Sequence, residues 1–188
     1  MSEPALQDRI VDDPVLRQRY AFRRVERDGR EVQEVEVWVD PGGGVLPHIH
    51  PTFEERFLVH EGEVTFWLGR KRQTAGAGET VVVPAGARHD YRNRSDAPAH
   101  MTCTATPPLP ALQGFLEDAA ALARTGGFTR QGMPTGWRAL LQAAVMLRHY
   151  RDDVLILRPP PFVQRLLLDP LARRAERRGY RAQPLAAP

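Results

Sequence analysis

A pair of histidines two residues apart, followed closely by a glutamate, limits what this chain can fold into more than its composition does. His48 and His50 are separated by one residue, and Glu55 follows after four more, all between the glycines that bound residues 42–62. Side chains two residues apart leave the same face of a β-strand, so a strand here would point both imidazoles to one side. The spacing therefore favours a short strand that presents two nitrogen ligands together.

The glutamate lies on a face that the sequence marks as apolar. Glu55 has the same strand parity as Phe57 and Val59. A carboxylate buried on such a face is costly unless it is paired or bound to a metal, and a divalent cation removes that cost. His89 comes from a later strand and would have to converge on the same point. Three imidazoles and one carboxylate suit Fe, Mn, Co, Ni, Cu or Zn better than Ca or Mg.

Glu54 is the alternative to Glu55 as the carboxylate ligand. Both glutamates lie within a usable spacing from the histidines. The parity of Glu55 with the apolar residues favours Glu55, which leaves Glu54 facing solvent on the opposite parity. We therefore predict Glu55.

The chain contains a second block of fixed spacing, in residues 78–93. It runs from Gly78 through five residues to Pro84-Ala85-Gly86, then through two to His89 and through three to Asn93. Together the two blocks resemble the two signature motifs of the cupin superfamily, and the match is complete at both. The resemblance implies a mainly β fold, the cupin double-stranded β-helix or jelly-roll-like barrel. It implies structural roles for Asn93 and the glycines, and one divalent transition metal per chain with the ligands His48, His50, Glu55 and His89.

Short strand-like runs separated by turns support a barrel in residues 20–107. The runs 20–25 and 31–39 flank Asp28-Gly29, which is a strong two-residue hairpin turn. Further short runs continue to residue 105, and such a series is typical of a sandwich or barrel. Residues 1–19 are expected to form an irregular lead-in.

Residues 108–188 are predicted to form an α-helical C-terminal extension that packs on the barrel. Helical periodicity occurs in 110–124, in 137–149 and in a basic amphipathic segment, 162–178, that Pro170 should kink or split. Some strands carry apolar residues on both faces, and the outward-facing ones must be shielded from water. We therefore expect the extension to dock on the outer face of the barrel.

The charge of the chain divides at the same boundary. Residues 1–107 hold 14 basic and 17 acidic side chains, whereas residues 108–188 hold 12 and 6. We interpret this division of charge as a basic extension that contacts an acidic barrel, in preference to a basic segment that binds nucleic acid or a membrane. The Arg-rich run between residues 173 and 181 is read as the solvated face of a helix; membrane or nucleic-acid binding is the weaker alternative.

The remaining composition excludes several classes of protein. A single cysteine, Cys103, excludes a disulfide framework and a cysteine-rich zinc module. We see no signal-peptide pattern, and the longest apolar runs of about five residues are far short of the roughly 20 that a membrane span needs. We therefore expect a cytoplasmic protein that acts on a small-molecule ligand or substrate, with neither nucleic acid nor membrane as a partner. By resemblance, we expect a homodimer.

The predicted ligand set points to oxygenase-type chemistry. Four protein ligands on an octahedral ion leave two adjacent positions, enough for a substrate and O₂. One carboxylate against a +2 ion leaves a local charge of +1, which favours anionic substrates. Phe57 and Tyr91 share the ligand-facing parity and are candidates for lining the pocket, although ordinary core packing explains them as well. We predict a metal-dependent Fe(II)-type dioxygenase; a sensing or binding cupin and a metal-dependent isomerase or cyclase are the alternatives.

Three other side chains are assigned structural roles. His60 has the parity opposite to Glu55 and is expected at the surface. His100 could reach the pocket from the last strand, but a lone histidine is more often structural. Cys103 is read as a small core residue, because a nucleophilic role needs a nearby base that the sequence does not show.

Overall fold

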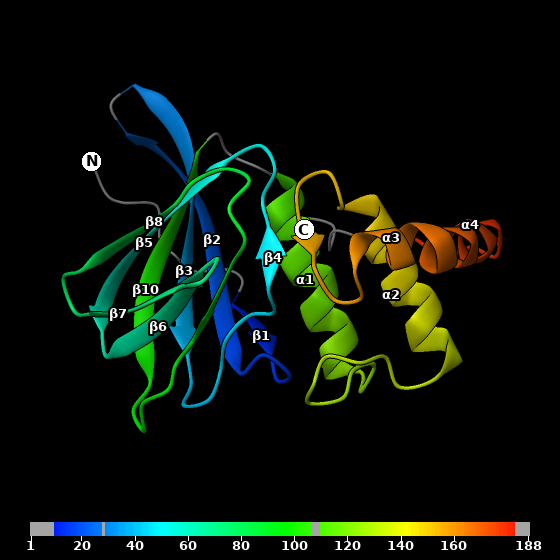
Figure 1. Cartoon of the computed structure of the whole chain (residues 1–188), viewed down its shortest axis with the longest axis horizontal. Coiled ribbons are helices and arrows are strands. Elements are labelled where there is room, and N and C mark those ends of the chain that lie inside the picture. Colours follow the sequence, from blue (N-terminus) through cyan, green and yellow to red (C-terminus); the bar gives the residue numbers. More distant parts are fainter. Residues whose placement is uncertain (1–9, 28, 107–109, 183–188) are drawn as a thin grey trace.

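The chain forms two antiparallel sheets followed by a group of helices (Figure 1). The computed structural model describes residues 10–27, 29–106 and 110–182, so residues 1–9 of the expected lead-in, the turn residue Asp28 and the expected boundary at 107–108 lie outside the described residues. The order of a mainly β barrel followed by an α-helical extension confirms the predicted fold class.

The two sheets lie face to face and enclose the core. The six-stranded sheet has the order β1 (Val11–Asp13), β2 (Gln18–Arg27), β3 (Arg30–Val39), β10 (Ala99–Thr106), β5 (Glu54–Glu61) and β8 (Thr80–Val83). The five-stranded sheet has the order β11 (Leu155–Ile156), β4 (His48–Ile49), β9 (His89–Arg92), β6 (Glu63–Leu68) and β7 (Lys71–Gly76).

The predicted hairpin is present and sets the inward face of the first sheet. Arg27 lies opposite Arg30, which leaves a two-residue turn, and the same register places Tyr20 opposite Val37. Val35 and Val37 are buried, as their alternation with polar residues predicted. The inner faces of both sheets form one apolar cluster.

Three strands differ from the sequence expectation. β7 was not predicted, because its residues are mostly polar and only Ala75 is buried; it is an edge strand, where exposed charges are common. β1 begins at Val11, inside the segment expected to be irregular. β4 contains two residues where five were expected, because Pro47 and Pro51 bracket it and cannot donate ladder hydrogen bonds.

Two glycines allow the backbone to approach itself closely near the histidine strands. A Cβ at Gly44 would lie 2.3 Å from the carbonyl oxygen of Tyr91, and one at Gly62 would lie 2.6 Å from that of Pro98. Gly62 also has a φ of 70°, a conformation that favours glycine. The Asn93 side chain donates to the carbonyl oxygens of Val39 and Ala97, which suits the structural role predicted for it.

The extension contains α1 (Pro110–Arg124), α2 (Trp137–His149) and a helical segment made of α3 (Pro161–Val163), η1 (Gln164–Leu168) and α4 (Asp169–Arg177). The first two helices have the predicted bounds. The third segment is interrupted as Pro170 predicted: η1 is π-helical and immediately precedes α4. Proline lacks an N–H donor and its ring crowds the preceding turn, so the local hydrogen-bond pattern widens there.

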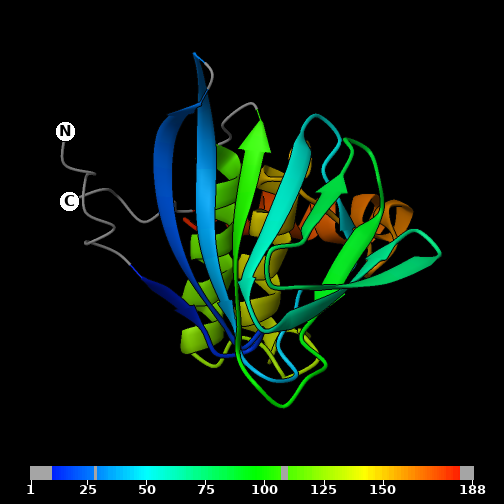
Figure 2. The same ribbon diagram turned by 90° about the vertical axis from the view of Figure 1, so that its left-hand side faces the viewer.

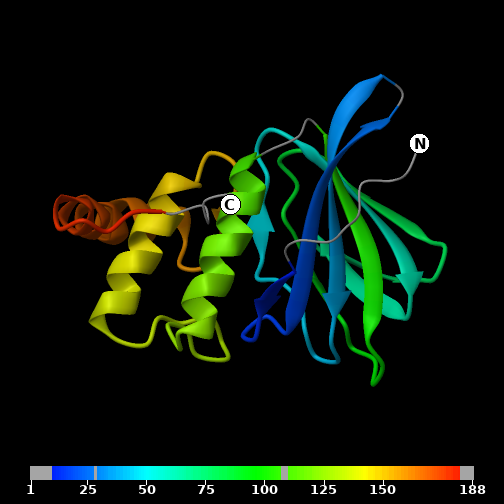
Figure 3. The ribbon, with the colours of Figure 1, turned by 180° about the vertical axis from the view of Figure 1, so that it is seen from behind.

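The extension closes the open side of the barrel and leaves the outer sheet face uncovered. α1 lies between the barrel strands and α2, and the helices lie behind the strands when the barrel faces the viewer (Figures 2 and 3). Ala120 of α1 is buried in the same cluster as the inward residues of the sheets. Leu58, on the outer face of β5, remains 38% exposed. The expected docking on the outer face is therefore wrong: α1 packs instead against the apolar cluster between the two sheets.

Two arginines of the extension form ion pairs within it, whereas Arg124 of α1 donates to the backbone carbonyl oxygen of Asp12 in β1 at 2.8 Å. Arg148 contacts Glu176 at 2.6 Å, and Arg151 pairs with Asp169. The two ion pairs hold the extension together and do not dock it on the barrel; Arg124 is the arginine that contacts the barrel, at the backbone of Asp12. Among the described residues, no helix is both long enough and apolar enough to cross a bilayer.

Candidate metal centre

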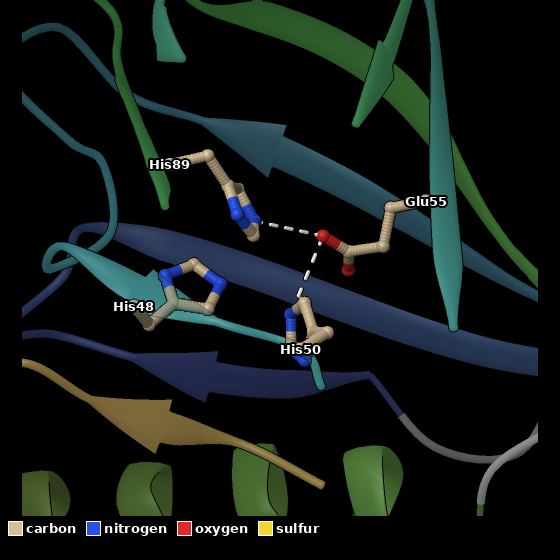
Figure 4. Close-up of side chains that lie close together, drawn as sticks. All are labelled: His48, His50, Glu55 and His89. Carbon is tan, nitrogen blue, oxygen red and sulfur yellow. Dashed lines mark hydrogen bonds and ion pairs between the residues drawn. The ribbon is translucent and has the colours of Figure 1, made fainter. Parts of the chain in front are cut away.

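The four predicted ligands meet at one point inside the barrel (Figure 4). His48 on β4 lies opposite His89 on β9 in the sheet register, and Glu55 projects from β5 of the facing sheet. One ligand atom from each of these side chains and from His50 lies within 4.8 Å of every other, and all four residues are buried. The two separate sequence blocks thus form a single cluster.

Each imidazole is oriented by a backbone carbonyl. The Nδ1 of His48 donates to the carbonyl oxygen of Leu46 at 2.7 Å, and the Nδ1 of His89 donates to that of Ala87 at 3.1 Å. A carbonyl oxygen can only accept, so the proton lies on Nδ1 in each ring. The lone pair of a neutral ring is then on Nε2, on the side of the cluster, which is the arrangement that metal-binding histidines use.

The carbonyl that orients His50 comes from the extension. Its Nδ1 donates to the carbonyl oxygen of Asp153 at 2.9 Å, more than 100 residues away. β11 then pairs with β4, placing Ile156 opposite His48. This contact could not be predicted from the sequence, because it rests on a backbone atom of Asp153.

The distances around Glu55 fit a metal ion. Its Oε2 lies 2.9 Å from the Nε2 of His89 and 3.3 Å from the Nε2 of His50. Ligand atoms bound at right angles, about 2.1 Å from one ion, are separated by about 3 Å. The buried Nε2 of His50 has no hydrogen-bond partner among the described atoms, despite its proximity to Glu55. An unsatisfied buried nitrogen aimed at a carboxylate is the feature that a cation would complete.

The protonation equilibria of the cluster favour an ionised carboxylate. Burial by itself would raise the pKa of Glu55, but the proximity of His50 and the hydrogen bond from His89 outweigh burial and hold that pKa well below its ordinary value. Burial, reinforced by the other two histidines, lowers the pKa of His48 well below its ordinary value. Burial would also lower the pKa of His50, yet the Glu55 carboxylate raises it overall. An anionic Glu55 and a neutral His48 are the states in which these groups bind metals.

The choice between the two glutamates agrees with the geometry. Glu55 is buried in the cluster, whereas Glu54 is exposed and lies 3.6 Å from the guanidinium of Arg56. Three nitrogen donors and one carboxylate suit a divalent transition metal such as Fe, Mn, Co, Ni, Cu or Zn. The structure supports a divalent metal site without distinguishing among these ions.

The cluster lies at the closed end of an apolar cavity of about 360 Å³. The barrel wall of the cavity includes Phe57 and Tyr91, the two residues predicted to line a pocket, and both also pack in the barrel core. The opposite wall comes from the extension, with Phe115 on α1 and Ala143 on α2 among its residues. The extension therefore forms part of the cavity, which the sequence analysis did not predict.

Two further side chains in the cavity wall were not predicted as functional. Cys103 places its Sγ 3.5 Å from the Oε1 of Glu55, and burial together with that charge raises the pKa of the thiol well above its ordinary value. A neutral thiol is a poor nucleophile, which agrees with the expected core role.

The buried hydroxyl of Tyr20 has no hydrogen-bond partner among the described atoms. Tyr20 pairs with the inward-facing Val37 across the hairpin, and this pairing is the feature that could have indicated that the Tyr20 side chain points inward.

The histidines that were given structural roles lie outside the cluster. The Nε2 of His60 lies 2.6 Å from the Oγ1 of Thr102 at the outer face of the sheet. His100 contacts Glu36 at 2.8 Å and stacks on Trp38. Among the described residues, neither His60 nor His100 belongs to the four-residue cluster.

Comparison with known proteins identifies the barrel. A family model described as a cupin domain matches residues 35–105, which contain all four cluster residues. Comparison with curated proteins finds no match. TT1209 from Thermus thermophilus is 27% identical over 48% of this chain and 85% of its own, with a TM-score of 0.42.

Two other similar structures have assigned names. A cupin sugar phosphate isomerase from Silicibacter pomeroyi is 25% identical over 48% of this chain and 59% of its own (TM-score 0.42). The polyketide cyclase RemF from Streptomyces resistomycificus is 22% identical over 56% and 78% (TM-score 0.46). The family match and the two complete motifs identify residues 35–105 as a cupin domain.

Proposed function

We propose that this cupin is a metal-dependent enzyme of the Fe(II)-type dioxygenase class that acts on a small organic substrate. His48, His50, Glu55 and His89 hold one divalent transition metal per chain. When bound, such an ion supplies Lewis acidity and, if it is Fe(II), redox chemistry with O₂. A metal-dependent isomerase or cyclase would use the same site without O₂.

One observation carries the proposal. In each of the three histidines Nδ1 donates to a backbone carbonyl, so Nε2 is left as the metal-binding atom. The three Nε2 atoms face one point, which lies at the end of a cavity. A metal site built only for stability would be closed on all sides by protein ligands, whereas a catalytic site keeps an open position. The cavity provides access to such a position.

The chain contributes binding, orientation and exclusion of water. The carbonyls of Leu46, Asp153 and Ala87 hold the rings in position. The largely apolar cavity wall limits the water around the cluster and strengthens its electrostatic interactions. The single carboxylate leaves a net positive charge with a divalent ion, which favours an anionic oxygen donor on the substrate.

Metal analysis tests the site. Protein purified without added metal should contain about one transition-metal ion per chain, and His48→Ala or His89→Ala should lose it. His100→Ala is the matched control, because His100 lies on the outer sheet face, and it should keep the metal. Folded wild-type protein that cannot be loaded with metal would contradict the proposal.

Oxygen uptake tests the reaction class. Protein loaded anaerobically with Fe(II) should consume O₂ with at least one member of a panel of phenols, diketones and thiols. Substrate turnover without O₂ uptake would assign the isomerase or cyclase alternative instead.

A sensing function is the second candidate, because one structural feature favours it. The extension forms one wall of the cavity and also supplies the Asp153 carbonyl to His50, so a bound molecule touches both parts of the chain. Tight ligand binding with no turnover under any metal would support a sensor and contradict the enzyme.

We also propose a cytoplasmic homodimer that uses no nucleic-acid or membrane partner. Barrels of this superfamily commonly pair through their sheets, and the exposed Leu58 lies on the outer face of the six-stranded sheet. Sedimentation equilibrium should give twice the chain mass of 21.2 kDa, and Leu58→Glu should shift it toward the monomer. A wild-type monomer at all concentrations would overturn the dimer.

A further inference from the structure

The cavity beside the metal centre has a mainly apolar lining, which the four metal ligands do not account for. Its volume of about 360 Å³ lies within the range of small-molecule sites. Most of its wall is apolar; the polar side chains are those of the cluster, Asp13 and Tyr20 at the barrel end, and Arg158 in the extension. One end is therefore suited to a polar group and the rest to an apolar one.

The direction of the cavity follows from the exposure of its wall. At the barrel end the cluster residues are buried. At the other end the lining residues Met133 and Leu167 are 62% and 57% exposed, so the cavity opens to solvent through the extension. A molecule entering there passes between α1, α2 and η1 before it reaches the barrel.

The barrel end contains a polar group that lacks a partner. Tyr20 is 1% exposed and lines the cavity, and its hydroxyl makes no hydrogen bond to the described atoms. Tyr91, in the same wall, is by contrast satisfied, because its hydroxyl donates to the Oε1 of Gln18 at 2.6 Å. A buried unpaired hydroxyl costs free energy unless a ligand or water completes it.

We propose that the ligand of this site is an amphipathic small molecule, with an anionic oxygen-donor head at the cluster and an extended apolar body in the extension. The Tyr20 hydroxyl donates a hydrogen bond to the head. The apolar body lies between the barrel and the helices, so the extension determines which body lengths are accepted. The position of the head rests on the proposed metal function, whereas the preference for an apolar body does not.

A homologous ligand series tests the apolar body. Straight-chain carboxylates from four to twelve carbons are titrated calorimetrically into Zn(II)-loaded and metal-free protein. Each methylene buried should tighten binding about four-fold until the cavity is full, after which the affinity stays constant. The same dependence on length should persist without metal, with every affinity lower. An affinity independent of chain length would overturn the inference even if the protein binds metal normally.

Two substitutions locate the two ends of the ligand. Ala119→Leu on α1 narrows the cavity and should end the gain in affinity at a shorter chain; Ala121→Leu, on the same helix but outside the cavity wall, is the matched control and should leave the series unchanged. Tyr20→Phe should weaken every carboxylate about ten-fold without changing the dependence on length. It should not lower the thermal stability, because it removes an unpaired group.

The outcomes separate the two proposals. Failure of wild-type protein to bind Zn(II), with the length dependence intact, would refute the metal site and retain the apolar-body assignment. Normal metal binding with equal effects of Ala119→Leu and Ala121→Leu would refute the assignment of the cavity and retain the metal site. Unchanged binding in Tyr20→Phe would refute the role of its hydroxyl.

Discussion

At the scale of single residues, the site depends on how each ligand is held as much as on which ligands are present. Three imidazoles donate through Nδ1 to backbone carbonyls, and the buried Nε2 of His50 remains without a hydrogen-bond partner among the described atoms. Contacts of this kind fix ring orientation and tautomer, and loss of such a contact commonly weakens metal binding 10–100-fold. The residue types alone would not produce the site without these carbonyls.

The pKa shifts predict opposite pH dependences with and without metal. In metal-free protein the pKa of His48 is lowered from its ordinary value of 6.5. His48 therefore contributes its full stabilisation above pH 6.5 and loses it as the pH falls through the folded-state pKa. The raised pKa of His50 makes its contribution complete below 6.5 and lost as the pH rises through the folded-state pKa. The contribution of these histidines to metal-free stability should therefore be greatest near pH 6.5.

Metal binding should remove the decline in stability above pH 6.5, because the metal-bound state requires neutral imidazoles. Urea unfolding at pH 5.5, 6.5, 7.5 and 8.5, with and without a chelator, measures both curves. The gap in unfolding free energy between loaded and metal-free protein should widen from pH 6.5 to 8.5. A constant gap would contradict the assigned ligand protonation.

At the scale of elements, a short strand and a π-helical turn connect the extension to the metal centre. β11 pairs with β4, and the segment that follows it is held by Gln164 of η1, whose Nε2 donates to the carbonyl oxygens of Ile156 and Pro159 at 2.6 and 2.7 Å. Gln164 is 2% exposed, so water cannot easily replace it. The position of the Asp153 carbonyl therefore depends indirectly on this glutamine.

Gln164→Ala should lower the free energy of unfolding by about 2 kcal/mol, because it leaves two buried carbonyls without donors. Amide exchange in residues 154–157 should accelerate more than exchange in β6. Gln142→Ala is the control: its amide donates to the Arg181 carbonyl oxygen at the exposed surface, and its effect should stay within about 0.5 kcal/mol. Equal effects of the two substitutions would contradict the role assigned to Gln164.

At the scale of the whole molecule, barrel and extension share one cavity and one sheet. α1 contributes Ala120 to the barrel cluster, and α2 and α4 form their own cluster on the far side of α1. Because neither part completes its apolar surface alone, we expect the chain to unfold as one cooperative unit.

Calorimetry and tryptophan fluorescence should report a single, coincident transition. Trp38 and Trp67 lie in barrel strands and Trp137 at the start of α2, so Trp137→Phe restricts the fluorescence signal to the barrel. Free metal at about 100 times its dissociation constant should raise the midpoint by about 5–10 °C in both readouts. Separate transitions, with the metal shifting only the barrel, would show that the two parts are energetically independent.

Much of the barrel could be read from residue spacing because its determinants are local. Strand alternation, the Asp28-Gly29 turn and the interval from His50 to Glu55 each depend on a few neighbouring residues. The bounds of α1 and α2 were predictable for the same reason, since proline and glycine mark their ends. β7 escaped prediction because an edge strand needs no apolar alternation.

The four-residue cluster was expected from the resemblance of the two motifs to the cupin signatures, and the order of barrel and helices from local residue patterns. The position of the extension, the shape of the cavity and the carbonyl partner of His50 do not follow in this way. They depend on backbone atoms, such as the Asp153 carbonyl 103 residues from His50, and on apolar surfaces of separate elements, which carry no local pattern, and they become defined only when α1 packs against the open side of the barrel.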